Sequence, residues 1–207
     1  TLQSRDLPGG KLTNIDNFIQ KLKFWNNENI KGATIESSYS IGATGLGLYL
    51  FARMSWNMNE DYKSLEDDYY NKIYGAAGSA VKELNENFTD DSLKIYKTIK
   101  ATYPVFDNET KNLSLEKNQS YCLTSFKAYL HYVYLFTMNK VDKSKTQEQK
   151  CDEVLNFVYG TFFKMMVNPF TVNNYFMQKS TTKDYMLANW NQKIAKTGET
   201  KFTSIVQ

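Results

Sequence analysis

Residues 115–139 read LEKNQSYCLTSFKAYLHYVYLFTMN and predict one long helix. The most apolar part, residues 129–138, is interrupted by His131. It is shorter than the roughly 20 apolar residues that span a bilayer, so we expect a helix inside a folded domain and no membrane span. The whole chain uses few turn residues, with 10 Gly and 3 Pro among 207 residues. This scarcity favours long helices with few connections over a strand-rich sandwich.

Composition narrows the class of protein further. Aromatic residues make up 15% of the chain, which argues against disorder because disordered chains lack the apolar surface that offsets chain entropy. The net charge is only +3, and the basic residues form no long run. Nucleic-acid binding is therefore not expected. The chain starts at Thr1 and not at Met, and we expect that its N-terminus was trimmed from a longer sequence.

Local signals place helices on both sides of the central stretch. On the N-terminal side, Asp90 or Asp91 is expected to cap a helix. We expect this helix to end at Tyr103, because Pro104 disfavours the α conformation of the residue before it. On the C-terminal side, Thr146-x-x-Gln149 resembles a capping box for a helix that runs to residue 167. Asn168-Pro169 is typical of a new helix start, and a last helix is expected over residues 182–195.

The N-terminal quarter of the chain has a different pattern. Apolar residues at helical spacing predict a helix over residues 15–25, and residues 31–36 predict a short strand. Residues 37–47 contain three glycines and are expected to form a loop that leads into a helix over residues 46–56. The expected fold is mainly α, a multi-helix bundle with a short helix–strand remnant at the N-terminus.

Few residues in this sequence could carry catalytic chemistry. His131 is the only histidine, and we interpret it as a side chain packed among aromatic residues. Cys122 and Cys151 are interpreted as two buried thiols, with a disulfide between neighbouring helices as the alternative in an oxidising compartment. Two cysteines and one histidine cannot supply four zinc ligands, so no metal site and no cofactor are expected. The acid pairs at residues 67–68 and 90–91 are interpreted as helix-start residues.

Three residues remain as candidates for substrate binding. Glu36 lies at the C-terminal end of the predicted strand, which in a (β/α)₈ barrel faces the mouth of the active site. It is the one catalytic candidate, although glycoside hydrolysis needs two carboxyl groups. Tyr39 lies in the loop that follows Glu36, and Trp56 ends the next predicted helix. Helical spacing favours a core position for Trp56 and for Trp25, so stacking on a sugar is the less expected role for both.

Several segments together resemble a known family. They are IKGATIE at residues 30–36, GLYLFARMSWN at residues 47–57, and IYGAA at residues 73–77, with Leu65 and Tyr69-Tyr70 between them. They are similar to an uncharacterised family of glycoside-hydrolase-like proteins that is common in gut Bacteroidetes. That family resembles the (β/α)₈ alpha-glucuronidases and beta-hexosaminidases. The family pattern has Pro after Trp-Asn and a Tyr-Tyr-Gly-x-Ala ending, whereas this chain has Met58 and Tyr-Gly-Ala-Ala at residues 74–77.

The resemblance spans residues 12–88, and more loosely the helices to residue 180. It implies that residues 1–56 are the end of a barrel-like βα segment, that residues 57–197 form a helical C-terminal domain, and that residues 198–207 are a tail. It also implies a periplasmic or extracellular location and a parent protein that acts on glycans. The family motifs supply no matched catalytic residue, so this chain is not expected to be catalytic by itself. The alternative is a stand-alone helical protein-interaction module without sugar chemistry.

Overall fold

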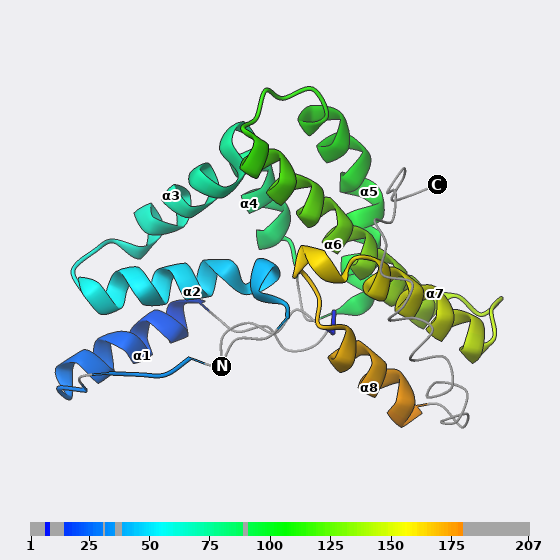
Figure 1. Ribbon diagram of the computed structural model, residues 1–207, viewed down its shortest axis with the longest axis horizontal. Coiled ribbons are helices and arrows are strands. Elements are labelled where there is room, and N and C mark those ends of the chain that lie inside the picture. Colours follow the sequence, from blue (N-terminus) through cyan, green and yellow to red (C-terminus); the bar gives the residue numbers. More distant parts are fainter. Residues whose placement is uncertain (1–6, 9–14, 31, 36–38, 89–90, 180–207) are drawn as a thin grey trace.

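The computed structural model describes residues 7–8, 15–30, 32–35, 39–88 and 91–179. The regular elements in these residues are all helices, which confirms the predicted mainly α fold (Figure 1). In chain order they are α1 (Ile15–Asn27), α2 (Ile41–Trp56), α3 (Tyr62–Tyr74), η1 (Gly75–Ala77), α4 (Gly78–Glu86), α5 (Ser92–Thr110), α6 (Lys117–Val141), α7 (Gln147–Gly160), η2 (Phe162–Lys164) and α8 (Pro169–Lys179).

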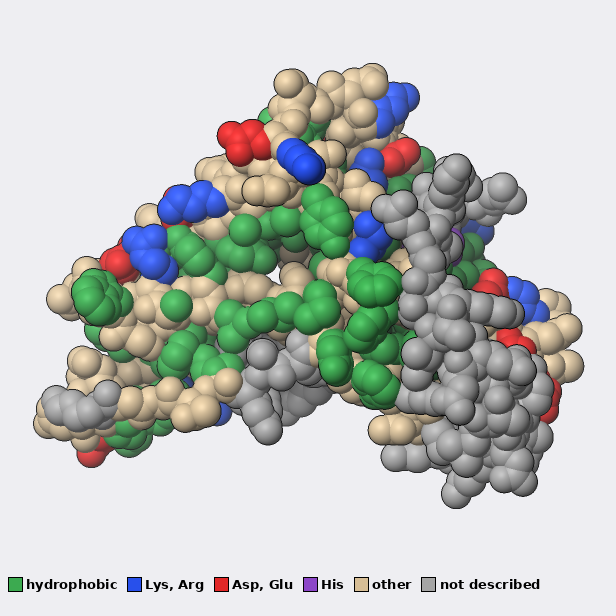
Figure 2. All heavy atoms as spheres, in the orientation of Figure 1, with side chains coloured by type: hydrophobic (Ala, Val, Ile, Leu, Met, Phe, Trp, Pro, Cys, Tyr) green, Lys and Arg blue, Asp and Glu red, His purple; other side chains and the backbone are tan. Residues whose placement is uncertain are grey.

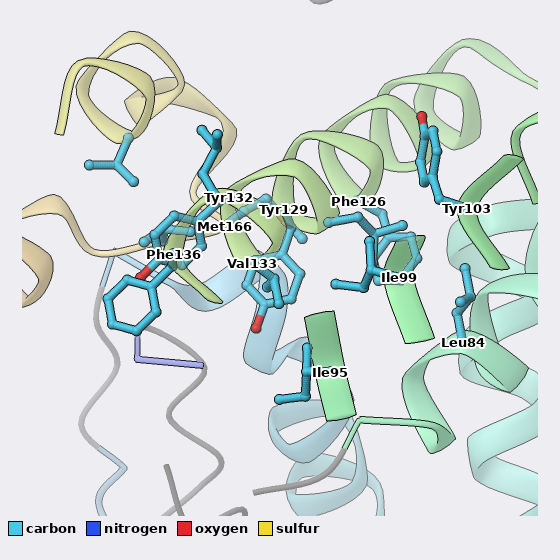
Figure 3. Packing of buried hydrophobic residues seen from close by; sticks show 14 of the residues in the cluster. Leu84, Ile95, Ile99, Tyr103, Phe126, Tyr129, Tyr132, Val133, Phe136 and Met166 are labelled. Carbon is cyan, nitrogen blue, oxygen red and sulfur yellow. The ribbon is translucent and has the colours of Figure 1, made fainter. Parts of the chain in front are cut away.

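Helix α6 confirms the long helix predicted over residues 115–139, and it lies at the centre of the fold. A capping box opens it, in which Gln119 accepts a hydrogen bond from the backbone N–H of Glu116 at 3.2 Å. The second half of α6 is buried on nearly every side, with Leu130 and Tyr132 both 0% exposed. Helices α3, α5 and α7 pack around it. Figure 3 shows Ile99 of α5 beside Phe126 of α6 in this main hydrophobic core.

A second, smaller hydrophobic core joins the N-terminal helices. Phe18, Ile19 and Leu22 of α1 are buried against Leu50 and Met54 of α2, and Leu65 of α3 completes the cluster. Leu46 and Tyr49 of α2 pack against both cores, so α2 connects α1 to the central bundle. The proposed domain boundary after residue 56 stays a prediction.

The strand predicted over residues 31–36 is not found in the described part of that segment. Residues 32–35 have no regular secondary structure, and no strand occurs elsewhere in the residues that the structure describes. A strand requires a neighbour to accept and donate its backbone hydrogen bonds, and the described residues offer none. The expectation of a helix–strand remnant is therefore wrong for residues 32–35, although the helix that precedes them, α1, is confirmed.

The glycine-containing segment predicted as a loop is mostly helix. Helix α2 begins at Ile41 and includes Gly42, Gly45 and Gly47. These glycines permit close packing: a Cβ at Gly42 would lie 2.6 Å from Met166 Sδ, and one at Gly45 would lie 2.7 Å from Tyr69 Oη. Glycine content misleads here because it reflects the approach of neighbouring elements and not a turn.

Two further helix ends differ from the prediction. Helix α5 continues through Pro104 to Thr110, because Phe106 and Thr110 are buried on the same side as Ile99 and hold the last turns against the core. Helix α7 stops at Gly160 instead of residue 167, and a short η2 turn follows. The capping box at Thr146 and the helix start at Pro169 are confirmed.

Other expectations fall partly outside the described residues. Glu36, the helix over residues 182–195 and the tail over residues 198–207 all lie there. Cys122 and Cys151 are both free thiols, and Cys151 is buried whereas Cys122 is half-buried. Within the described part of the chain, no helix is long and apolar enough to cross a membrane.

Candidate functional site

The start of α2 is fixed against the turn between α7 and α8. The first N–H groups of a helix have no partner within the helix, and here the backbone N–H of Gly42 donates to the carbonyl oxygen of Met165 at 2.7 Å. Met165 itself adopts a left-handed conformation with φ 53°. Ser40 is buried, and its carbonyl accepts from Ala43 and Thr44 in the first turn. The segment before α2 is thereby held beside η2.

Aromatic rings gather at this junction. The ring of Tyr39 lies 5.1 Å from that of Phe162 and 5.6 Å from that of Phe170, centroid to centroid, and Phe162 lies 5.9 Å from Phe163. Tyr121 of α6 joins them, because its hydroxyl donates to the carbonyl oxygen of Phe163 at 3.2 Å. We call Tyr39, Tyr121, Phe162, Phe163 and Phe170 the aromatic surface.

The aromatic surface is open to solvent. Phe163 is 63% exposed, Tyr121 is 53% exposed and Tyr39 is 43% exposed. Figure 2 shows hydrophobic side chains gathered over α2 and over the region where α8 begins. Contiguous exposed apolar side chains on a folded protein typically mark a site that binds something. The aromatic surface is therefore the candidate functional site.

A lysine adds charge at the edge of this surface. Lys164 Nζ lies 5.2 Å from the centroid of the Tyr121 ring, within the range of a cation–π contact. The five residues of the aromatic surface contain two hydroxyl groups and no carboxyl group. They can bind a ligand through ring faces and hydrogen bonds, but they supply no pair of acids for hydrolysis.

The three residues that the sequence suggested for substrate binding do not form one site in the described part of the structure. Tyr39 belongs to the aromatic surface, whereas Glu36 lies outside the described residues. Trp56 ends α2 at the opposite end from Tyr39, and the 16-residue helix spans about 22 Å at 1.5 Å per residue. Tyr39 and Trp56 therefore cannot contact the same sugar ring.

The expected core position of Trp56 is wrong, because this side chain is 92% exposed. Helix α2 buries Gly47, Leu50 and Met54, and Trp56 points about 200° around the helix from Met54. Trp25, in contrast, is half-buried and packs against the smaller core as predicted. Trp56 is thus an isolated exposed aromatic residue, separate from the aromatic surface.

Sequence reasoning missed four of the five aromatic residues in the surface. The helix predicted to run to residue 167 would include both Phe162 and Phe163. A usable signal was the pair itself: adjacent positions on a helix point about 100° apart, so two neighbouring Phe residues do not both fit a narrow buried face. Gly160, two residues before Phe162, also permits a helix end.

The other titratable groups near α2 are held in an ion-pair network. Arg53 Nη1 donates to Tyr49 Oη at 2.8 Å, and Arg53 Nη2 lies 2.5 Å from Glu60 Oε2. Asp68 accepts from Lys72 Nζ at 2.7 Å and from the hydroxyl of Tyr49. The hydrogen bond from Lys72, followed by that from Tyr49, lowers the pKa of Asp68. These paired charges link α2 to α3.

The helix-start interpretation of the acids is confirmed for Asp91, whereas Asp90 lies outside the described residues. Asp91 caps α5, because its carboxylate accepts from the N–H groups of Leu93 and Lys94. Helix α3 is capped by Asp61 instead, so Asp67 and Asp68 lie within the helix. Asp67 pairs with Lys82 of α4 at 2.7 Å. Both acids of α3 therefore contribute to helix packing and not to capping.

His131 packs beside an aromatic ring as the sequence predicts. Its ring centroid lies 4.5 Å from that of Phe157, on the face where α6 meets α7. Among the described residues, no group of three or more His, Cys, Asp or Glu side chains is placed to hold a metal ion.

One comparison with known proteins bears on the N-terminal part of the chain. Residues 9–86 match the family described as a domain of unknown function, DUF4838. The match runs from before α1 to the last residue of α4, so it includes Tyr39 and Trp56 but not η2 or α8. No curated protein and no solved structure matches the chain.

Proposed function

We propose that this chain is the helical portion of a carbohydrate-active, glycoside-hydrolase-like protein, and that the aromatic surface contacts glycan at the rim of a cleft. The observation that carries the proposal is the exposed group of aromatic rings at Tyr39, three residues after Glu36. The resemblance of residues 30–77 to glycoside-hydrolase-like proteins supports the choice of a glycan as ligand. A periplasmic or extracellular location belongs to the same proposal.

The chemistry of the aromatic surface suits a carbohydrate. Sugar rings present C–H faces that pack on aromatic rings, and their hydroxyl groups need a few hydrogen-bonding partners at the edge. Tyr39 and Tyr121 supply hydroxyl groups, and Lys164 supplies a donor beside Tyr121. Because the surface contains no carboxyl pair, we propose that it binds and orients glycan while residues of a parent protein would carry out hydrolysis.

Glycan arrays probed with matched variants test this proposal. We expect wild-type protein to bind a subset of oligosaccharides, and Tyr39→Ala and Phe163→Ala each to weaken binding about tenfold, the range of one lost aromatic contact. Trp56→Ala is the matched control, because it removes an equally exposed aromatic residue at the other end of α2. Loss of binding in Trp56→Ala alone would place the glycan site elsewhere and overturn the proposal.

Two further results would also count against the proposal. Robust hydrolysis of aryl glycosides or oligosaccharides by the purified chain would show that it is catalytic by itself. If wild-type protein binds no glycan on the array, the alternative of a helical protein-interaction module without sugar chemistry is favoured. In that case the aromatic surface would be the first place to seek the partner.

A further inference from the structure

A cavity of about 300 Å³ lies between α1 and the C-terminal half of α2. Trp25 of α1, Phe51 of α2 and Met58 beyond α2 form its apolar walls, and Gly32 lies on its remaining side. This volume is at the lower end of the range of small-molecule sites. The cavity is next to the smaller core, at the opposite end of α2 from Tyr39.

The turn after α1 builds one wall of this cavity. Asn29 adopts a left-handed conformation with φ 56°. The N–H of Ile30 donates to the carbonyl oxygen of Trp25 at 3.0 Å, and the N–H of Asn29 donates to that of Asn26 at 3.1 Å. This is the Schellman pattern of a helix C-terminus, which reverses the chain direction. It brings Ile30, Gly32 and Ala33 back alongside the two helices.

The described side chains that line the cavity carry no formal charge, and two of them are polar. Asn26 supplies an amide and Ser55 a hydroxyl group. Elsewhere in these helices, hydroxyl groups donate to the carbonyl four residues earlier, as in Thr110 to Phe106 and Thr137 to Val133. Among the described residues, the Ser55 hydroxyl makes no hydrogen bond of this kind, and the Asn26 amide makes no side-chain hydrogen bond. Both groups are therefore available to a ligand.

We propose that this cavity binds a neutral small molecule that has an apolar ring and one or two hydrogen-bonding groups. Trp25 and Phe51 offer ring faces to such a ligand, and Asn26 and Ser55 can bond its polar group. A charged ligand would lose hydration without meeting an opposite charge on the lining residues that the structure describes, which disfavours it. This site is separate from the aromatic surface and does not depend on the proposed glycan binding.

Titrations monitored by two-dimensional amide NMR test the site with three named probes. Indole is a neutral ring with one donor, benzoate is a charged ring, and methyl β-glucopyranoside is a hydroxylated ring without an aromatic face. We expect indole to shift the amide signals of residues around Trp25 and Ser55 in a saturable way. We expect benzoate and the glucoside to bind at least tenfold more weakly.

Two variants fill the cavity from opposite walls. A Cβ at Gly32 would meet no atom within 4 Å, so Gly32→Leu is accommodated there, and Ser55→Leu adds the same side chain from the exposed side of α2. Each should weaken indole binding at least tenfold without lowering the melting temperature. Ala52→Leu is the matched control, since Ala52 is exposed on α2 and lies outside the lining.

Four outcomes would overturn this proposal. They are the absence of saturable shifts with indole, shifts that centre on Tyr39 or Phe163 instead, binding of benzoate as tight as that of indole, and unchanged binding in both filled variants. Loss of indole binding in Gly32→Leu and Ser55→Leu, with normal binding in Ala52→Leu, supports it. The array result for Tyr39→Ala does not alter either conclusion, so the two proposals can fail separately.

Discussion

At the scale of single residues, Gly75 is the position where the backbone most clearly requires glycine. It joins α3 to η1 with φ 56° and ψ −131°, a region that other residues rarely adopt. A Cβ here would also lie 2.4 Å from Gln119 Oε1, the group that completes the capping box of α6. Gly75 thus permits both the turn between α3 and η1 and the close approach of the first turn of α6.

We predict that Gly75→Ala lowers the free energy of unfolding by about 1–3 kcal/mol, the cost of holding such a conformation. Urea denaturation followed by circular dichroism measures the change. Gly32→Ala is the matched control, because a Cβ there meets no atom within 4 Å. Its effect should stay within about 0.5 kcal/mol. Equal effects of the two substitutions would contradict the role given to Gly75.

Two acids on α3 should respond to pH in opposite directions. The pKa of Asp68 is below its ordinary value of 3.8, chiefly because Lys72 donates a hydrogen bond to it. Folding therefore favours the charged form, and this contribution is present above pH 3.8 and is lost as pH falls through the folded-state pKa. Burial raises the pKa of Glu66 above 4.5, so its contribution is lost as pH rises through that region.

The prediction concerns the slope of stability against pH in the acidic range, below 3.8 for Asp68 and above 4.5 for Glu66. Asp68→Asn should flatten the rise of unfolding free energy with pH, and Glu66→Gln should steepen it. Urea denaturation at several pH values measures both slopes. Because each variant changes one acid on the same helix, each serves as the control for the other. A flatter slope in Glu66→Gln would show that burial does not dominate its pKa.

At the scale of elements, α5 shows tertiary contacts overriding a local signal. Pro104 has no N–H to donate to the carbonyl of Lys100, and its ring disfavours a straight helix. The helix nevertheless continues, because Phe106 is 3% exposed and Thr110 is 4% exposed against the core. Pro104 itself is on the exposed side, where the carbonyl left without a donor can meet water.

We predict that Pro104→Ala stabilises the protein by about 2 kcal/mol. The proline penalty in a helix interior is about 3 kcal/mol, and the greater freedom of the unfolded chain opposes the gain by up to about 1 kcal/mol. The melting temperature measured by calorimetry should rise. Val105→Ala, at the next exposed position of the same helix, should change it little. A lower melting temperature in Pro104→Ala would mean that proline fits this position of α5 better than alanine does.

Local sequence signals predicted which helices exist better than where they end. The spacing of α1, the capping box of α7 and the Asn-Pro start of α8 were recognisable because each depends on a few neighbouring residues. The glycines of α2 and the proline of α5 misled because their surroundings come from distant segments. Most of the aromatic surface was missed for the same reason: it combines Tyr39, just before α2, with residues from α6, η2 and α8.

At the scale of the whole molecule, the two hydrophobic cores differ in size and in the number of helices that form them. The main core includes residues of every helix from α3 to α8, and α6 passes through it. The smaller core depends on α1, which packs chiefly on α2. A helix held by one neighbour can open without unfolding the rest, since local opening costs less where fewer buried contacts are lost.

Hydrogen exchange can distinguish the two cores. We predict that Ile19→Ala, in α1, reduces amide protection in α1 and leaves α5 and α6 unchanged. Leu130→Ala, in α6, should reduce protection in α5 and α6 by about 2–5 kcal/mol, the usual cost of this truncation in a core. Both side chains are almost fully buried, with Ile19 at 2% and Leu130 at 0% exposure. The two variants therefore differ mainly in which hydrophobic core they disturb. Equal loss of protection in α6 for both variants would show that the cores unfold as one unit, and that α1 with the cavity beside it is as stable as the central bundle.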